Sequence, residues 1–152
     1  MRISVDGRHG SSPRGIGRYV RYVLGAWPAP DQVVEVPGRR AAFAAGALLG
    51  RPRLDRMAGG ADVVWLPAPG PVAVSRDVPV VLTLHDLSWV LRPQDFTAYE
   101  RAWHGLARIP ALARRADRVV ADSRATADVA LEHWRLDPDR LSVVQPGPGL
   151  AG

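Results

Sequence analysis

Two polar pairs in this chain carry side chains suited to chemistry: His85 with Asp86, and Ser123 with Arg124. Each pair follows closely on a short apolar run. A histidine can donate a hydrogen bond to a ligand hydroxyl or phosphate, and an adjacent carboxylate can orient neighbouring groups. An arginine and the free amides of a helix N-terminus both bind anions. Because ligands bind outside the carboxyl ends of the strands in an open α/β sheet, the pairs predict two sides of one cleft.

Each pair also has a purely structural interpretation. His85 and Asp86 would then only cap backbone groups at the end of a strand, and Ser123 would cap the helix that follows it. Trp89 would either stack on a sugar or cover the core. The residues alone leave these alternatives open.

Gly15 and Gly17 lie between an expected strand and an expected helix. Glycines at this position let the backbone approach an anion, and the helix dipole favours the negative charge. Together with Glu35 the two glycines suggest a dinucleotide fingerprint. Against it, Val20 occupies the position of the third glycine, and the loop 7–14 is longer than the tight turn that the fingerprint needs. The alternative is a helix start that only requires small residues.

No metal site is expected. Asp137 and Asp139 form a D-x-D pattern beside a proline, between an expected helix and an expected strand, where we interpret them as turn residues. His9 lies in a loop from which it could move onto a ligand, whereas His104 and His133 lie on expected helices and are assigned structural roles. The chain has no cysteine, which excludes disulfides and thiolate-metal sites.

The elements that must position these residues alternate along the chain. Strands are expected at 2–5, 32–36, 62–66, 78–84, 118–121 and 141–144, and helices at 16–27, at 97–115 with a kink or a new start at Pro110, and after Ser123. The expected apolar helix stripes are Ile16, Val20, Val23, Leu24 and Trp27; Tyr99, Trp103, Leu106, Pro110 and Ala113; and Ala127, Ala130, Leu131 and Trp134. Residues 39–60 are the least readable, with a weak helix at 41–49. The alternation predicts an α/β fold: a Rossmann-like, three-layer α/β/α sandwich around a mainly parallel sheet.

Composition limits the class of protein. The 152 residues suffice for one domain, and all twenty basic residues are arginine, giving a net charge of +5. The arginines are scattered, so nucleic acid is not an expected partner. No apolar run is long enough to span a bilayer, and the start of the chain is typical of a strand rather than of a signal peptide, so we expect a cytoplasmic protein. Arginines on the first helix and Arg39–Arg40 also predict peripheral contact with an anionic membrane at its inner face.

The order of four motifs resembles the N-terminal half of a GT-B fold retaining glycosyltransferase of family 4 (group 1). The motifs are Gly-Ile-Gly-Arg-Tyr-Val (15–20), Val-Leu-Thr-Leu-His-Asp-Leu (81–87), Arg-Arg-Ala-Asp-Arg-Val-Val-Ala-Asp-Ser-Arg-Ala-Thr (114–126) and Asp-Arg-Leu-Ser-Val-Val-Gln-Pro-Gly (139–147). The resemblance implies that residues 1–146 are the acceptor-side domain, one half of the GT-B fold. It further implies that 147–152 begin an interdomain linker to a missing C-terminal, donor-binding domain.

The resemblance also implies roles for individual residues. Gly15 and Gly17 would lie near the substrate phosphates, and Ser123 and Arg124 would face the cleft. His85, with Asp86 beside it, would reach the transferred sugar. The implied partners are a nucleotide-sugar donor and a sugar or lipid-linked acceptor. The resemblance implies no metal and no other cofactor.

Without a donor domain the chain alone is expected to be inactive, because the groups that stabilise the leaving diphosphate would be missing. Two rival functions remain. One is a nucleotide-dependent oxidoreductase that uses Gly15, Gly17 and Glu35. The other is a stand-alone, non-catalytic Rossmann-like binding module.

Overall fold

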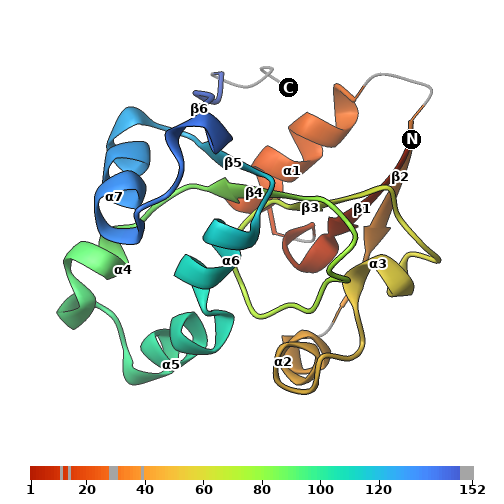
Figure 1. Ribbon diagram of the computed structural model, residues 1–152, viewed down its shortest axis with the longest axis horizontal. Coiled ribbons are helices and arrows are strands. Elements are labelled where there is room, and N and C mark those ends of the chain that lie inside the picture. Colours follow the sequence, from red (N-terminus) through yellow and green to blue (C-terminus); the bar gives the residue numbers. More distant parts are fainter. Residues whose placement is uncertain (11, 14, 28–30, 39, 148–152) are drawn as a thin grey trace.

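The computed structural model describes residues 1–10, 12–13, 15–27, 31–38 and 40–147. Its centre is a six-stranded sheet in the order β2-β1-β3-β4-β5-β6, in which every neighbouring pair is parallel (Figure 1). The strands are β1 (Arg2–Asp6), β2 (Gln32–Val36), β3 (Val63–Leu66), β4 (Val80–Leu84), β5 (Arg118–Ala121) and β6 (Leu141–Val143). All six predicted strands are confirmed, with boundaries that differ by at most two residues from the expected ones.

Helices connect the strands. They are α1 (Ile16–Gly25), α2 (Arg40–Leu49), α3 (Leu54–Met57), α4 (Ser88–Leu91), α5 (Ala98–Ala107), α6 (Ile109–Arg115) and α7 (Arg124–Trp134), with the short 3-10 turns η1 (Gly7–His9), η2 (Pro93–Asp95) and η3 (Pro138–Arg140). The weak helix expected at 41–49 is confirmed as α2. The single-turn helices α3 and α4 were not predicted, because four residues are too few to show a helical period.

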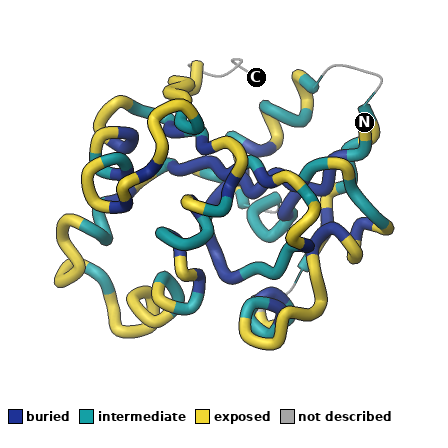
Figure 2. Tube along the Cα trace, viewed as in Figure 1, coloured by how far each residue is buried: buried dark blue, intermediate teal, exposed yellow. Residues whose placement is uncertain are grey.

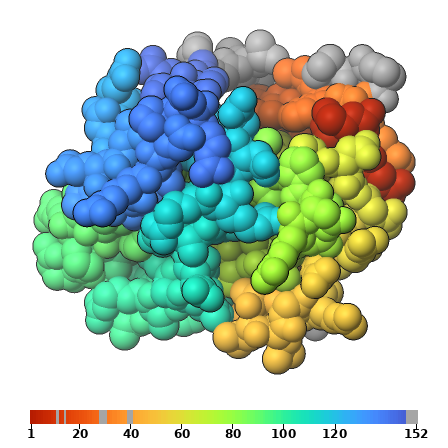
Figure 3. All heavy atoms as spheres, in the orientation of Figure 1, coloured from red at the N-terminus to blue at the C-terminus, as the bar shows by residue number. Residues whose placement is uncertain are grey.

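The sheet separates two apolar layers because successive strand side chains point to opposite faces. On one face Ile3, Val5 and Trp65 are buried under α1. On the other face Leu66, Leu82 and their neighbours pack in one cluster with residues of α2, α3, α5, α6 and α7. These helices cover one face of the sheet (Figure 1), and in the space-filling view the cyan and blue segments that include α6 and α7 lie toward the viewer (Figure 3). The buried residues concentrate along the strands (Figure 2). The predicted three-layer Rossmann-like sandwich is confirmed.

The chain turns back at β1, which has β2 on one side and β3 on the other. In open α/β sheets such a switch of direction leaves a crevice outside the carboxyl ends of the strands, where ligands bind. A ligand site is therefore expected along the carboxyl ends of β1, β3, β4 and β5.

One predicted helix is two helices. The segment expected at 97–115 breaks at Arg108, whose φ of 47° is left-handed and ends α5, and Pro110 lies in the first turn of α6. Pro110 thus starts a second piece, which was one of the two expected outcomes. The apolar stripe predicted across both helices is wrong at Tyr99, which is 62% exposed. The residues buried at the junction of the two helices are Ala107 and Ile109, which the predicted stripe did not include.

Candidate functional site

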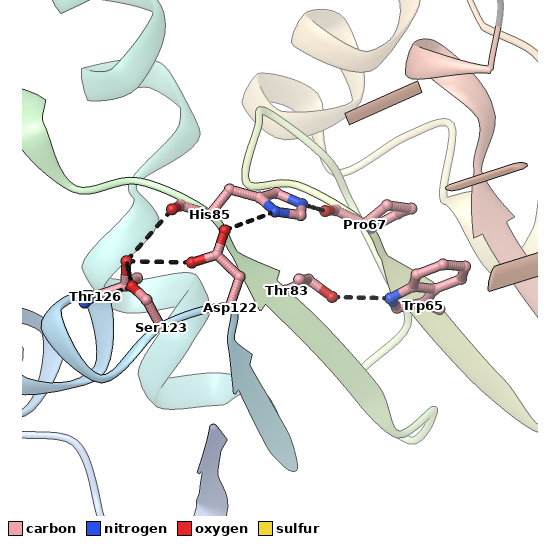
Figure 4. Close-up of polar contacts among 7 residues, drawn as sticks. All are labelled: Trp65, Pro67, Thr83, His85, Asp122, Ser123 and Thr126. Atoms are coloured by element: carbon pink, nitrogen blue, oxygen red, sulfur yellow. Dashed lines mark hydrogen bonds and ion pairs between the residues drawn. The ribbon is translucent and has the colours of Figure 1, made fainter. Parts of the chain in front are cut away.

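Three strand ends meet at one point on the carboxyl edge of the sheet. Pro67, His85 and Asp122 each come directly after the last residue of β3, β4 and β5. The parallel register pairs Leu84 with Ala121, so His85 and Asp122 leave the sheet side by side. Their positions are therefore set by buried strands and not by mobile loops (Figure 4).

His85 bridges its two neighbours. Its Nε2 lies 2.8 Å from the carbonyl oxygen of Pro67, and its Nδ1 lies 3.3 Å from Oδ2 of Asp122. The side chains of His85 and Asp122 are 18% and 21% exposed. The imidazole is thus held between two oxygen atoms (Figure 4), and part of it remains exposed to solvent.

The turn after β5 closes the site from the other side. The Ser123 hydroxyl accepts a hydrogen bond from the amide of Thr126 at 3.2 Å, which confirms that Ser123 caps α7. The hydroxyl of Thr126 lies 3.3 Å from the His85 carbonyl oxygen and 3.4 Å from Oδ1 of Asp122. Ser123 is therefore linked to the His85 strand end through one threonine (Figure 4).

Aromatic and hydroxyl side chains support the site from the α1 face. Nε1 of Trp65 donates to the Thr83 hydroxyl at 3.1 Å, and both residues are buried (Figure 4). The ring of Tyr19, on α1, packs edge-to-face against the His85 ring at 4.8 Å. Burial, together with the negative charge of Asp122, raises the pKa of Tyr19, although a hydrogen bond with Thr83 acts in the opposite direction.

Asp86 and Arg124 lie apart from these contacts. Asp86 is exposed, and its carboxylate accepts from the amide and the hydroxyl of Ser88, the first residue of α4, at 2.7 and 2.6 Å. Arg124 is exposed at the first position of α7. The structure therefore brings together His85 and Ser123 of the predicted residues, and it places Asp122, rather than Asp86, against the histidine ring.

The two predicted glycines have local structural roles. Gly15 precedes α1 with a φ of 56°, a conformation that glycine adopts without strain. Gly17 is buried, and a side chain there would collide with the backbone of His9 and Ser12. Gly17 thus allows α1 to pack against the loop that follows β1.

A second charged pair lies at the end of β1. The guanidinium of Arg8 forms an ion pair with Asp6, donates from Nη1 to the Pro71 carbonyl at 3.0 Å, and stacks over the Phe43 ring at 4.4 Å. The side chains of Arg8 and Asp6 are only 4% and 0% exposed. Sequence reasoning missed this pair, because nothing in the sequence tells which arginine is buried.

A cavity of about 460 Å³ lies beside this pair. Its lining residues are Gly7, Arg8, Gly10, Glu35, Pro37 and Gly38. The side chain of Glu35 occupies the space that side chains at Gly7 and Gly10 would fill. Glu35 therefore approaches the glycines of the loop directly after β1, whereas the dinucleotide fingerprint would associate it with the Gly15–Gly17 segment.

His104 and the Asp137–Asp139 pair lie in the structural positions expected of them, whereas the ligand role considered for His9 stays a prediction. Asp137 accepts from the amide of Asp139 at 3.0 Å and starts η3, which confirms the turn interpretation. His104 packs against Trp89 at 4.7 Å, and burial lowers its pKa. His9 ends η1.

The described residues contain neither a metal-binding cluster nor a membrane-spanning helix. No group of three or more His, Cys, Asp or Glu side chains in this part of the chain is arranged to hold a metal ion. Within the same residues, none of the helices combines the length and apolar character needed to cross a membrane.

Asp122, Pro67 and Tyr19 are the site residues that sequence reasoning missed. Asp122 carried the same signal as His85, a polar residue directly after a buried strand, and could have been found by it. Pro67 contributes only a backbone oxygen, and Tyr19 reaches the site from another layer, so neither has a local signal.

Comparison with known proteins identifies relatives. Residues 9–148 match the family described as Glycosyltransferase Family 4. A D-inositol 3-phosphate glycosyltransferase of Salinispora tropica is 33% identical over 144 residues, which cover 89% of this chain and 29% of the relative. Enzymes with the same name from Salinispora arenicola and Xylanimonas cellulosilytica are 36% and 34% identical, over 77% and 76% of this chain and 27% and 29% of their own length. The chain thus spans less than a third of these relatives.

Proposed function

The chain belongs to glycosyltransferase family 4, and from that premise we propose that it is the N-terminal, acceptor-side domain of a retaining glycosyltransferase. The whole enzyme transfers a sugar, as a hexosyltransferase does, from a nucleotide-sugar donor to a hydroxyl of a sugar or lipid-linked acceptor. In this assignment residues 1–146 form the domain and 147–152 lead toward a donor-binding domain. The reaction requires no metal or other cofactor.

The observation that carries this proposal is the gathering of His85, Asp122 and the start of α7 at the carboxyl edge of the sheet. His85 supplies a donor at Nε2 for a hydroxyl or phosphate oxygen. The N-terminal end of α7, where Arg124 is exposed, adds positive potential at the same edge of the sheet. Together they favour an oxygen-rich, anionic ligand at this edge.

The names of the three relatives supply a first acceptor to test. All three are called D-inositol 3-phosphate glycosyltransferases. A polyol phosphate suits an edge that offers hydrogen-bond donors and an arginine, so we choose D-inositol 3-phosphate as the probe.

Calorimetric titration of the chain with D-inositol 3-phosphate, with myo-inositol and inorganic phosphate as controls, tests the acceptor role. We expect the phosphorylated polyol to bind more tightly than either control. A panel of UDP- and GDP-sugars should bind weakly and give no transfer by this chain alone, since donor binding is assigned to residues outside it. Absence of binding by every acceptor in a wider sugar panel would favour the non-catalytic module.

Peripheral membrane contact is a finer part of the proposal. Arg18 is exposed on α1, but Arg21 donates to the carbonyls of Gly10, Ser12 and Pro13 and is engaged in the fold. Arg14 and Arg39 lie outside the described residues, as does the side chain of Arg40.

Flotation with anionic and neutral vesicles tests this contact, and equal recovery on both would remove it. The cytoplasmic location and the absence of a nucleic-acid partner stay predictions.

A further inference from the structure

The two oxygen atoms that contact the His85 ring determine which of its nitrogens carry hydrogen. The carbonyl oxygen of Pro67 can only accept a hydrogen bond, so Nε2 must carry a hydrogen to donate at 2.8 Å. The carboxylate of Asp122 also accepts, and it lies 3.3 Å from Nδ1. A neutral imidazole has one N–H, which would leave a lone pair facing an acceptor at one of these contacts. Both contacts are hydrogen bonds only when both ring nitrogens carry hydrogen.

Among the groups around His85, Asp122 is the carboxylate that contacts Nδ1 of the ring. Asp86, its neighbour in sequence, is bound to Ser88. The Tyr19 ring packs edge-to-face on the imidazole and restricts its rotation.

We propose that Asp122 is a positioning residue that accepts a hydrogen bond from Nδ1 of His85, so that the ring carries hydrogen on both nitrogens and its Nε2 donor is charge-assisted. The donor points to Pro67 in the free chain, and an incoming hydroxyl or phosphate oxygen shares or replaces that carbonyl. His85 therefore stabilises substrate oxygen and does not serve as a base. The role toward substrate rests on the proposed function, whereas the hydrogen on Nδ1 does not.

Long-range 1H–15N correlation of ring-labelled histidine in the chain at about pH 7 reads each nitrogen directly. In the wild type we expect hydrogen on both nitrogens of His85. In Asp122→Asn the amide can donate to Nδ1, so the ring should become neutral with hydrogen on Nε2 only. Asp128→Asn, which removes the same charge from an exposed position of α7, is the matched control and should leave the His85 signals unchanged.

Two results overturn the inference: an Nδ1 without hydrogen in the wild type, or an Asp122→Asn ring that still carries both hydrogens. The first needs no variant, so misfolding of Asp122→Asn cannot hide it. With D-inositol 3-phosphate as ligand, Asp122→Asn should weaken binding about tenfold, because the neutral ring keeps its Nε2 donor but loses the positive charge that strengthens the hydrogen bond to an anionic ligand. A wild-type chain that binds none of the probes contradicts the proposed function, while the ring nitrogens still decide the role of Asp122.

Discussion

Two pairs of a basic and an acidic side chain stand at strand ends of the same sheet, and they differ in what surrounds them. The Arg8–Asp6 pair after β1 is almost completely buried, and the His85–Asp122 pair after β4 and β5 is about one-fifth exposed. Arg8 directs its hydrogen-bond donors at the protein and lies against an aromatic ring. An ion pair at the ligand-binding edge of a sheet is therefore a candidate for binding only where its side chains remain accessible to solvent.

The difference follows from the cost of burying charge. A buried ion must keep its partners because removing one leaves the other desolvated and unpaired, so Arg8 and Asp6 hold the loop after β1 in place. The His85 and Asp122 side chains keep 18% and 21% of their surface exposed, so a ligand can reach this pair, which it cannot do at Arg8 and Asp6.

Breaking the buried pair should have the largest effect on stability. Arg8→Met leaves the Asp6 carboxylate buried without its cation, and we expect a loss of about 3–5 kcal/mol in the free energy of unfolding. Urea denaturation followed by circular dichroism measures it.

The matched control is Arg92→Met. Arg92 forms an exposed pair with Asp95, and its loss should cost at most about 1 kcal/mol. Equal losses in the two variants would contradict the distinction between buried and open pairs.

Loss of the Trp65–Thr83 hydrogen bond, on the strand that ends at His85, should have the next-largest effect on stability. Thr83→Val removes the acceptor of the buried Trp65 N–H, which leaves a desolvated donor without a partner. We expect a loss of about 1–3 kcal/mol by the same denaturation assay. A neutral outcome would show that the rigidity of this strand end does not depend on the Trp65–Thr83 bond.

A change at His85 should affect ligand binding more than the free energy of unfolding. His85→Gln should change the free energy of unfolding by no more than about 1 kcal/mol, because the pair is partly exposed. The same variant should weaken D-inositol 3-phosphate binding in calorimetry. A large loss of stability would place His85 in the same class as Arg8.

His104 differs from His85 because burial outweighs the influence of the nearby carboxylates Glu100 and Asp86 on its pKa, and changing it should give the smallest effect. Nδ1 of His104 is buried and has no hydrogen-bond partner among the described residues, and burial lowers the pKa of this group below its usual 6.5. The unfolded chain therefore takes up a proton at a pH where the folded chain does not. Stability should be full above pH 6.5 and decline as the pH falls from there toward the lowered pKa.

Unfolding measured at about pH 5.5 and about pH 7.5 tests this decline, and His104→Phe should reduce the difference between the two. An unchanged difference in the variant would assign the pH dependence to other groups.

The strands and the layers of the fold could be predicted from the sequence because parallel strands buried on both faces are continuous apolar runs, as in Val80–Leu84. Asp122 carried a strand-end signal of its own, but its pairing with the His85 ring could not be predicted. Asp86 was chosen for adjacency, yet successive residues at a strand end point in different directions. Asp122 reaches the ring through the register between β4 and β5, which no single strand displays. The burial of Arg8 likewise depends on Phe43 and Pro71, which are distant in sequence.

The central claim is that the acceptor binds at the open edge formed by β4, β5 and α7. A 1H–15N titration of the chain with D-inositol 3-phosphate locates the ligand most directly, because the amides of both regions are observed together. We predict that the shifts concentrate at His85 and at residues 122–126. Shifts confined to Gly7, Gly10 and Glu35, beside the buried pair, would contradict the claim.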